Sequence, residues 1–219
     1  MQSNRLYGYA LIVGAVLLLT VGATHPTGAK LFESRESFEH VALVDRFAHS
    51  AGIAGLWLTV VGFAGFSRFL GAERPTVAVA FITITIATGA GLVAPAIDGF
   101  VVPQLGDRWF VADEATRSTL RLLMQYCVMI ASALTRVYFV FASAAILLYS
   151  SELWRTQNNR GLARLGAFVA LAAIATAVGG PSMVSVHELL ALVVGQAIWM
   201  IWAGTILLKK LSQRAADTP

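Results

Sequence analysis

Six long apolar stretches constrain the fold more than any other feature of this sequence. Each is long enough to cross the hydrocarbon core of a bilayer, for which a helix needs about 20 mostly apolar residues. The stretches cover residues 6–24, 48–70, 76–97, 120–149, 162–178 and 186–208. We expect helices, because lipid offers backbone groups no partners and these runs lack the alternation of a β-barrel. The sequence therefore predicts an all-α, polytopic membrane protein with a bundle of six transmembrane helices.

The composition agrees with a single membrane domain. Hydrophobic residues make up 57% of the 219 residues and charged residues 13%, whereas soluble domains have about 45–50% and about 25%. We expect one transmembrane domain over residues 1–210, an extracytoplasmic loop with an amphipathic helix within 25–47, and a cytoplasmic tail over 211–219. The first stretch is longer than a signal-peptide core of about 7–15 residues, so we expect it to be retained.

The basic residues predict the orientation. If the N-terminus is cytoplasmic, nine of the 16 Lys and Arg residues lie on the cytoplasmic side, six lie outside, and Arg136 lies within the fourth stretch. Because basic residues favour the cytoplasmic side, we expect both termini in the cytoplasm and the protein in the cell membrane. The basic residues form no stripe interleaved with aromatic residues, so the net charge of +4 does not indicate nucleic-acid binding.

Histidines at the ends of three stretches form the main functional pattern. His25 ends the first stretch, His49 begins the second and His187 begins the sixth, so the predicted topology places all three at the outer boundary. The carboxylates expected at this level are Asp45, Asp98 and Glu188. Imidazole is the commonest metal ligand in proteins, and carboxylates orient such ligands or relay protons. We therefore predict a site for haem or a transition metal, although no H-x-H or H-E-x-x-H spacing occurs and histidine also suits an interface on its own.

Two further polar groups are candidate sites. Arg136 lies deep in the fourth stretch, where a charge is costly. We expect it to form an intramembrane polar pocket with three hydroxyl residues of the third stretch, or to reach toward the inner headgroups. Those hydroxyl residues are Thr83, Thr85 and Thr88. The members of the second group lie four residues apart on one face of the fourth predicted helix, where they would suit an anion. We expect Asp113 to cap this helix and to form an ion pair with Arg117. The group consists of Arg117, Arg121 and Gln125.

Small and aromatic residues have structural explanations. Glycines recur in the second stretch, where we expect close contact between helices. They are Gly52, Gly55, Gly62 and Gly65. The tryptophans lie mostly near the ends of stretches, as in an aromatic belt at the membrane interface. They are Trp57, Trp109, Trp154, Trp199 and Trp202.

These patterns support three functional hypotheses. The first is a membrane protein that binds haem or a transition metal near the outer surface and transfers electrons to a lipophilic partner such as a quinone. The second is a small permease or an accessory subunit of a membrane complex, in which polar residues serve packing and contact with other subunits. The third is a zinc-dependent intramembrane hydrolase in which Glu188 or Asp98 activates water. Membrane lipids are expected partners in each case.

Overall fold

The computed structural model describes residues 2–24, 34–179 and 186–216, and within them the side chains of residues 5–24, 34–179 and 190–209. The elements are α1 (Gln2–Thr24), α2 (Arg35–Leu70), α3 (Pro75–Ala96), the π-helix η2 (Ile97–Val101), α4 (Val102–Val111), α5 (Glu114–Arg155), α6 (Arg160–Gly179) and α7 (Val186–Ala216). Six helical segments in this part of the chain are long and apolar enough to cross a membrane. The prediction of an all-helical fold with six helices long and apolar enough to cross a membrane is confirmed for this part of the chain.

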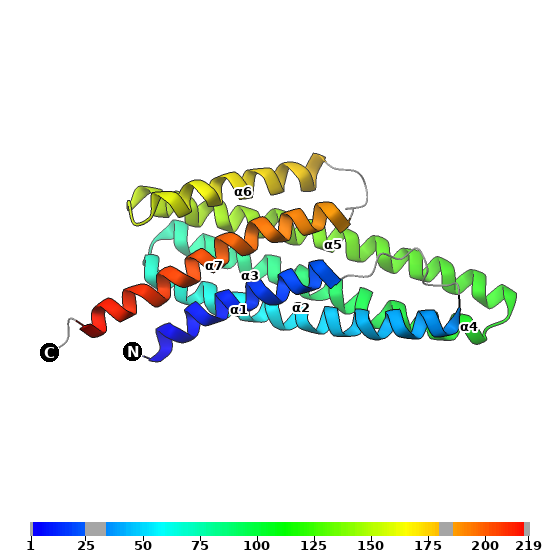
Figure 1. Cartoon of the computed structure of the whole chain (residues 1–219). Coiled ribbons are helices and arrows are strands. Elements are labelled where there is room, and N and C mark those ends of the chain that lie inside the picture. Colours follow the sequence, from blue (N-terminus) through cyan, green and yellow to red (C-terminus); the bar gives the residue numbers. More distant parts are fainter. Residues whose placement is uncertain (1, 25–33, 180–185, 217–219) are drawn as a thin grey trace.

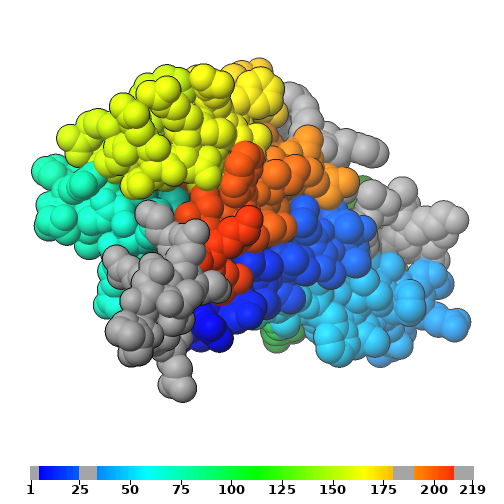
Figure 2. All heavy atoms as spheres, turned by 60° about the vertical axis from the view of Figure 1, so that its left-hand side comes forward, coloured from blue at the N-terminus to red at the C-terminus, as the bar shows by residue number. Residues whose placement is uncertain are grey.

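The six long helices form a closed bundle. Going round it, α1 packs against α2, α2 against α3, α3 against α5, α5 against α6, α6 against α7, and α7 against α1 (Figure 1). Figure 2 shows α7 lying between α6 and α1 on one face of the molecule. Each helix thus buries one side against two neighbours and presents the other side to the surroundings, as expected for a bundle in lipid.

Two helices are much longer than a bilayer requires. The 36 residues of α2 and the 42 residues of α5 correspond to about 54 and 63 Å, whereas the hydrocarbon core is about 30 Å thick. The start of α2, the η2–α4 segment and the start of α5 extend together beyond the ends of α1, α6 and α7 (Figure 1). We call this part the extension.

The extension differs from the loops that the sequence predicted. Residues 98–111, which lie between the third and fourth predicted stretches and would form a loop in that scheme, are helical and continue α3 through η2 into α4. Residues 35–47, expected as a separate amphipathic segment, form the first turns of α2. Hydropathy marks only the apolar part of a helix, and the helix continues for as long as its backbone bonds and side-chain packing are favourable.

Helix ends follow the local sequence. Asp113 caps α5 as predicted, since its carboxylate accepts a hydrogen bond from the Thr116 backbone N–H at 2.8 Å. The pKa of Asp113 lies below its ordinary value because of this hydrogen bond. Gly71 ends α2 with φ of 96°, a conformation that favours glycine.

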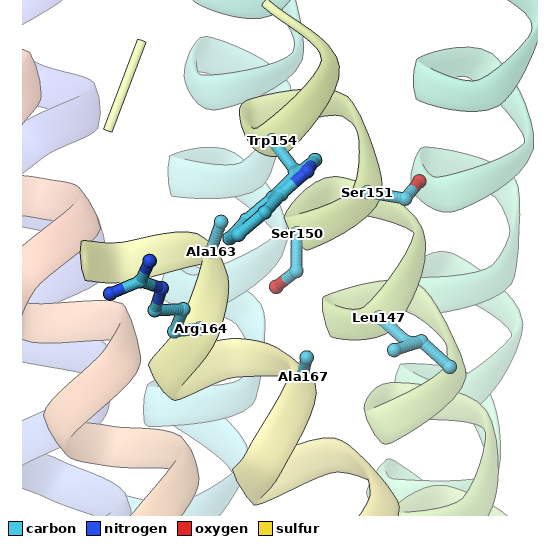
Figure 3. Close-up of a pocket in the computed structure, with 7 residues that line it drawn as sticks. All are labelled: Leu147, Ser150, Ser151, Trp154, Ala163, Arg164 and Ala167. Carbon is cyan, nitrogen blue, oxygen red and sulfur yellow. The ribbon is translucent and has the colours of Figure 1, made fainter. Parts of the chain in front are cut away.

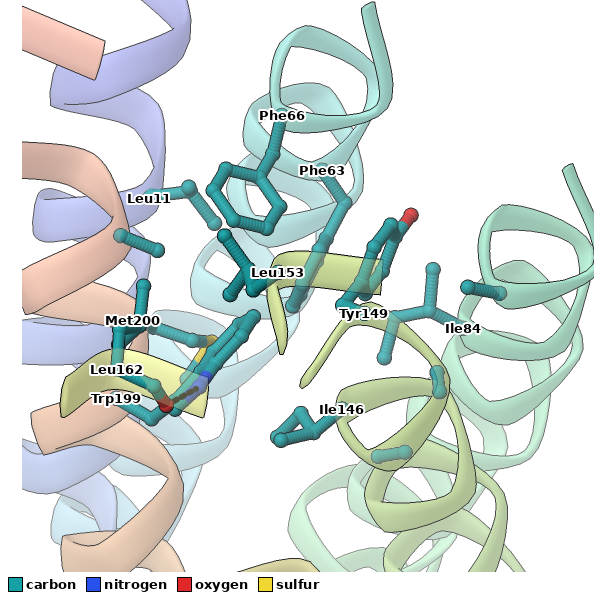
Figure 4. Packing of buried hydrophobic residues seen from close by; sticks show 14 of the residues in the cluster. Leu11, Phe63, Phe66, Ile84, Ile146, Tyr149, Leu153, Leu162, Trp199 and Met200 are labelled. Atoms are coloured by element: carbon teal, nitrogen blue, oxygen red, sulfur yellow. Dashed lines mark hydrogen bonds between the residues drawn. The ribbon is translucent and has the colours of Figure 1, made fainter. Parts of the chain in front are cut away.

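The core contains stacked aromatic side chains from three helices. Phe63 and Phe66 of α2, Tyr149 of α5 and Trp199 of α7 pack together, with the Phe63 and Tyr149 ring centroids 5.4 Å apart (Figure 4). Trp199 is fully buried, and its indole N–H donates to the Leu162 carbonyl of α6 at 3.1 Å. The prediction that Trp199 belongs to an interfacial belt is therefore wrong, because its ring and its N–H both find partners inside the bundle.

Close contact between α1 and α2 depends on glycine, as predicted. A Cβ on Gly55 would lie 3.1 Å from the Gly14 carbonyl oxygen, and a Cβ on Gly62 would lie 2.8 Å from the backbone nitrogen of Leu11. A Cβ on Gly65 would overlap the side chain of Tyr7. The two helices thus touch through their backbones, which only residues without a side chain permit.

Candidate functional site: a buried histidine between two carboxylates

His49 occupies a closed polar site where α2 meets η2. Only 4% of its surface is exposed. Its Nδ1 atom lies 2.9 Å from the Asp45 carbonyl oxygen and 3.1 Å from the Asp45 carboxylate on the same helix. Its Nε2 atom lies 3.5 Å from Oδ2 of Asp98, which η2 contributes. Two carboxylates therefore face opposite nitrogens of one imidazole.

The π-helix places Asp98 at this position. Helix α3 ends at Ala96, and the wider turn of η2 follows before α4 begins. Gly99 packs directly on the histidine, since a Cβ there would lie 2.5 Å from the His49 Cβ atom. Single π-helical turns occur often at functional sites, because they reorient side chains within a continuous helix. The glycine and the π turn together bring the Asp98 carboxylate to the ring.

The contacts of the His49 ring indicate which of its two nitrogens carries a proton. A carbonyl oxygen only accepts hydrogen bonds, so Nδ1 of His49 carries a proton that it donates to Asp45. In the neutral ring, the Nε2 lone pair would then face the Asp98 carboxylate, and two electron-rich atoms would lie close together. Three arrangements relieve this repulsion: a second proton on the ring, a proton on the Asp98 carboxyl group that is donated to Nε2, or a metal cation bound near Nε2.

The structure brings together three of the six residues predicted for the metal site. Asp45, His49 and Asp98 are in contact. His25 lies outside the described residues, and the side chains of His187 and Glu188 lie outside the described side chains. No group of three His, Cys, Asp or Glu residues with metal-binding geometry occurs among the described residues. The three-histidine arrangement therefore stays a prediction.

The threonines predicted to line a pocket with Arg136 do not share one environment. Each hydroxyl of Thr83, Thr85 and Thr88 donates to a carbonyl four residues earlier in α3. Thr88 is buried and Thr83 half-buried, but Thr85 is exposed, so it does not line an interior pocket. Residues two apart on a helix point in nearly opposite directions, which explains the difference. Arg136 is half-buried on α5.

Only part of the predicted anion-binding face is exposed, because one of its three residues contacts the end of α4. Arg117 donates to the carbonyl of Trp109 at 3.1 Å and to that of Phe110, and its guanidinium lies over the Trp109 ring. It thereby covers the end of α4 rather than pairing with Asp113, which is occupied as a helix cap. Arg121 and Gln125 are exposed on α5. Whether this face binds an anion stays a prediction.

Sequence reasoning missed a buried acid at the other end of the bundle. The fourth predicted stretch ends at residue 149, which leaves Glu152 in the connection that follows, but only 1% of its surface is exposed. It accepts hydrogen bonds from Arg74, which precedes α3, and from Arg155 at 2.9 Å. The i, i+3 spacing to Arg155 was readable from the sequence, whereas the contact with Arg74 depends on the tertiary fold. This cluster joins α3 to the end of α5.

Comparisons with known proteins do not indicate a family or a function for this chain. No protein-family model matches the chain, and no curated protein and no solved structure is significantly similar to it. Functional inference therefore rests on the site itself.

Proposed function

We propose that this protein is a small proton-conducting permease of the cell membrane, and that it takes up and releases a proton at Asp45, His49 and Asp98. The main observation in support of this proposal is the burial of His49 between carboxylates from two helical elements. Carboxylates on both sides offset the loss of hydration that a buried imidazolium suffers. Ionisable residues inside membrane bundles commonly mark proton and ion pathways.

The proposal includes an orientation. The excess of Lys and Arg on the side of the helix connections 71–74 and 156–159 supports a cytoplasmic location for both termini. The His49 site would then lie at the outer boundary, where the extension begins. A proton would reach the imidazole through Asp98, whose side chain is 29% exposed, whereas that of Asp45 is 13% exposed.

Proton flux into vesicles tests this function. The purified protein is reconstituted into potassium-loaded vesicles with a pH-sensitive dye inside, and valinomycin imposes a negative interior potential. We expect faster acidification than in protein-free vesicles, and a return to the protein-free rate for His49→Ala. His40→Ala is the matched control, because His40 is an exposed histidine of the same helix. Wild-type flux equal to that of protein-free vesicles would overturn the permease proposal.

A transition metal is the second candidate occupant, and one distance favours it. The Nε2 atom of His49 and the Oδ2 atom of Asp98 are 3.5 Å apart, which is long for a hydrogen bond. It resembles the separation of about 3.3 Å between two ligands of a tetrahedral zinc ion with bonds of about 2.0 Å. The hydrogen bond from Nδ1 to Asp45 is the support that metal-bound histidines normally have. His25 and His187 are the candidates to complete the ligand set, and a redox metal or haem there would serve electron transfer with a quinone.

Spectroscopy and metal analysis distinguish whether the site holds a proton, a metal ion or haem. A Soret band in the detergent-purified protein would indicate haem. Stoichiometric zinc, copper or iron in wild type and His40→Ala but not in His49→Ala would favour the metal site over the proton site. Stoichiometric zinc together with hydrolytic activity would restore the hydrolase hypothesis. Protein that carries no metal and conducts no protons would leave the accessory-subunit hypothesis.

A further inference from the structure

A groove opens between α5 and α6 at the end of the bundle opposite to His49. Its volume is about 370 Å³. Apolar lining comes from Leu147 and Trp154 of α5 and from Ala163 and Ala167 of α6 (Figure 3). The small alanine side chains leave the space between the two helices unfilled. The groove thus suits an elongated apolar group.

One polar atom in the groove lacks a partner. Ser150 lines the groove, only 2% of its surface is exposed, and its hydroxyl has no hydrogen-bond partner among the described residues. In Figure 3 this oxygen points toward α6. Buried hydroxyl groups are normally hydrogen-bonded, so an unpartnered one at a groove indicates an acceptor that the protein itself does not supply.

Two arginines lie at one mouth of the groove. The guanidinium groups of Arg160 and Arg164 lie 5.9 and 5.5 Å from the centre of the Trp154 ring, which is 50% exposed. Neither arginine makes an ion pair within the described part of the chain, whereas nearby Arg155 is neutralised by Glu152. The mouth therefore carries two uncompensated positive charges beside an aromatic ring.

The groove runs from a charged layer to an apolar one. The two arginines occupy the first turns of α6, and Phe168 and Leu171 follow on the same helix with 72% and 57% of their surfaces exposed. Exposed large apolar side chains on a membrane helix face acyl chains, while Arg and Trp prefer the headgroup level. One ligand could therefore contact a charged layer and an apolar layer at once.

We propose that the α5–α6 groove binds one anionic phospholipid. The phosphate lies between Arg160 and Arg164, the glycerol backbone lies beside Trp154, and one acyl chain follows Leu147 and Ala167. The Ser150 hydroxyl, which lies against Gly166 of α6, turns into the groove to donate to an ester oxygen. The predicted orientation places this end at the cytoplasmic leaflet, where anionic lipids are concentrated. This site is independent of the proton site and goes beyond the proposed function.

Native mass spectrometry with added lipid tests the proposal. Phosphatidylglycerol and phosphatidylcholine with identical acyl chains are added to the detergent-solubilised protein. We expect one phosphatidylglycerol to remain bound under conditions that remove phosphatidylcholine. Replacing both Arg160 and Arg164 with glutamine should weaken phosphatidylglycerol binding about 30-fold, as expected for the loss of two charges at an anionic lipid. The control is Arg5→Gln with Lys209→Gln, because both are exposed at the same end on other helices.

Two further arms separate lipid from free phosphate. Inorganic phosphate alone should neither bind nor displace the lipid, because most of the groove is apolar. Ala167→Leu narrows the groove and should weaken phosphatidylglycerol binding while an unchanged unfolding temperature shows that the fold is intact. Equal retention of both lipids, equal effects of the two double substitutions, or displacement by millimolar phosphate would each overturn the proposal.

Discussion

Replacing Gly62 with alanine tests whether backbone contact between α1 and α2 holds the bundle together. The new Cβ would lie 2.4 Å from Leu11 Cγ and 2.8 Å from the Leu11 backbone nitrogen. Carbon atoms prefer a separation of about 3.5–4.0 Å. A side chain can rotate away from such a clash, but the backbone nitrogen cannot. Helix α1 must therefore shift away from α2.

The expected magnitude follows from two opposing effects. Overpacking of a tight interior contact costs about 1–3 kcal/mol, while alanine favours a helix over glycine by about 1 kcal/mol. Because the clash involves a backbone atom, we take the upper part of this cost, about 2–3 kcal/mol, which leaves a net loss of about 1–2 kcal/mol of unfolding free energy. In a chain of this size such a loss lowers the unfolding temperature by about 2–8 °C.

Gly89→Ala is the matched control. Gly89 is exposed in α3, and a Cβ there would have no atom within 4 Å. This variant should keep or slightly raise the unfolding temperature, because only the gain in helix propensity remains. Both variants are compared by thermal unfolding in one detergent. An unfolding temperature for Gly62→Ala equal to or above that of Gly89→Ala would refute the close-contact argument.

Three further predictions concern other parts of the bundle. Glu152→Gln should lower stability by about 1–3 kcal/mol in thermal unfolding, because it removes a buried hydrogen-bonded charge, whereas the exposed Glu73→Gln should leave it unchanged. Amides in the first turn of α5 should lose protection, measured against intrinsic exchange rates at the same pH, as the pH falls through the lowered pKa of Asp113, because the cap is present above that pKa and lost on protonation; Asp113→Asn should remove this pH dependence. Trp199→Phe should destabilise the protein by about 1–3 kcal/mol, since an α6 carbonyl loses its donor. Unchanged unfolding temperature in that variant would show that the bond contributes nothing.

The parts of the fold that depend on local composition were predictable. Hydropathy located the six spans, since each is a long and predominantly apolar run. Asp113 was predicted as a cap because an acceptor precedes the helix, and the glycines of α2 were predicted as contact points because lipid-embedded helices approach closely at small residues. These features are determined within a few residues along the chain.

The candidate site was only partly predictable. The spacing of four between Asp45 and His49 places both on one helix face, which the sequence shows directly. The contact with Asp98 depends on a π turn, which the sequence does not reveal. Burial of Glu152 and Trp199 was missed for a related reason, because their partners Arg74 and Leu162 lie far away along the chain.

The π-helix has a consequence for how this polar site arose and how it can be removed. A turn closed by i→i+5 bonds holds one residue more than an α-helical turn, so a single inserted codon creates it and a single deletion abolishes it. Deleting Ile97 or Val101 would remove the extra residue and tighten the turn, so the remaining residues of this segment would leave α3 in other directions. The histidine and both acids would all survive in the sequence, yet Asp98 and Gly99 could no longer both meet the ring.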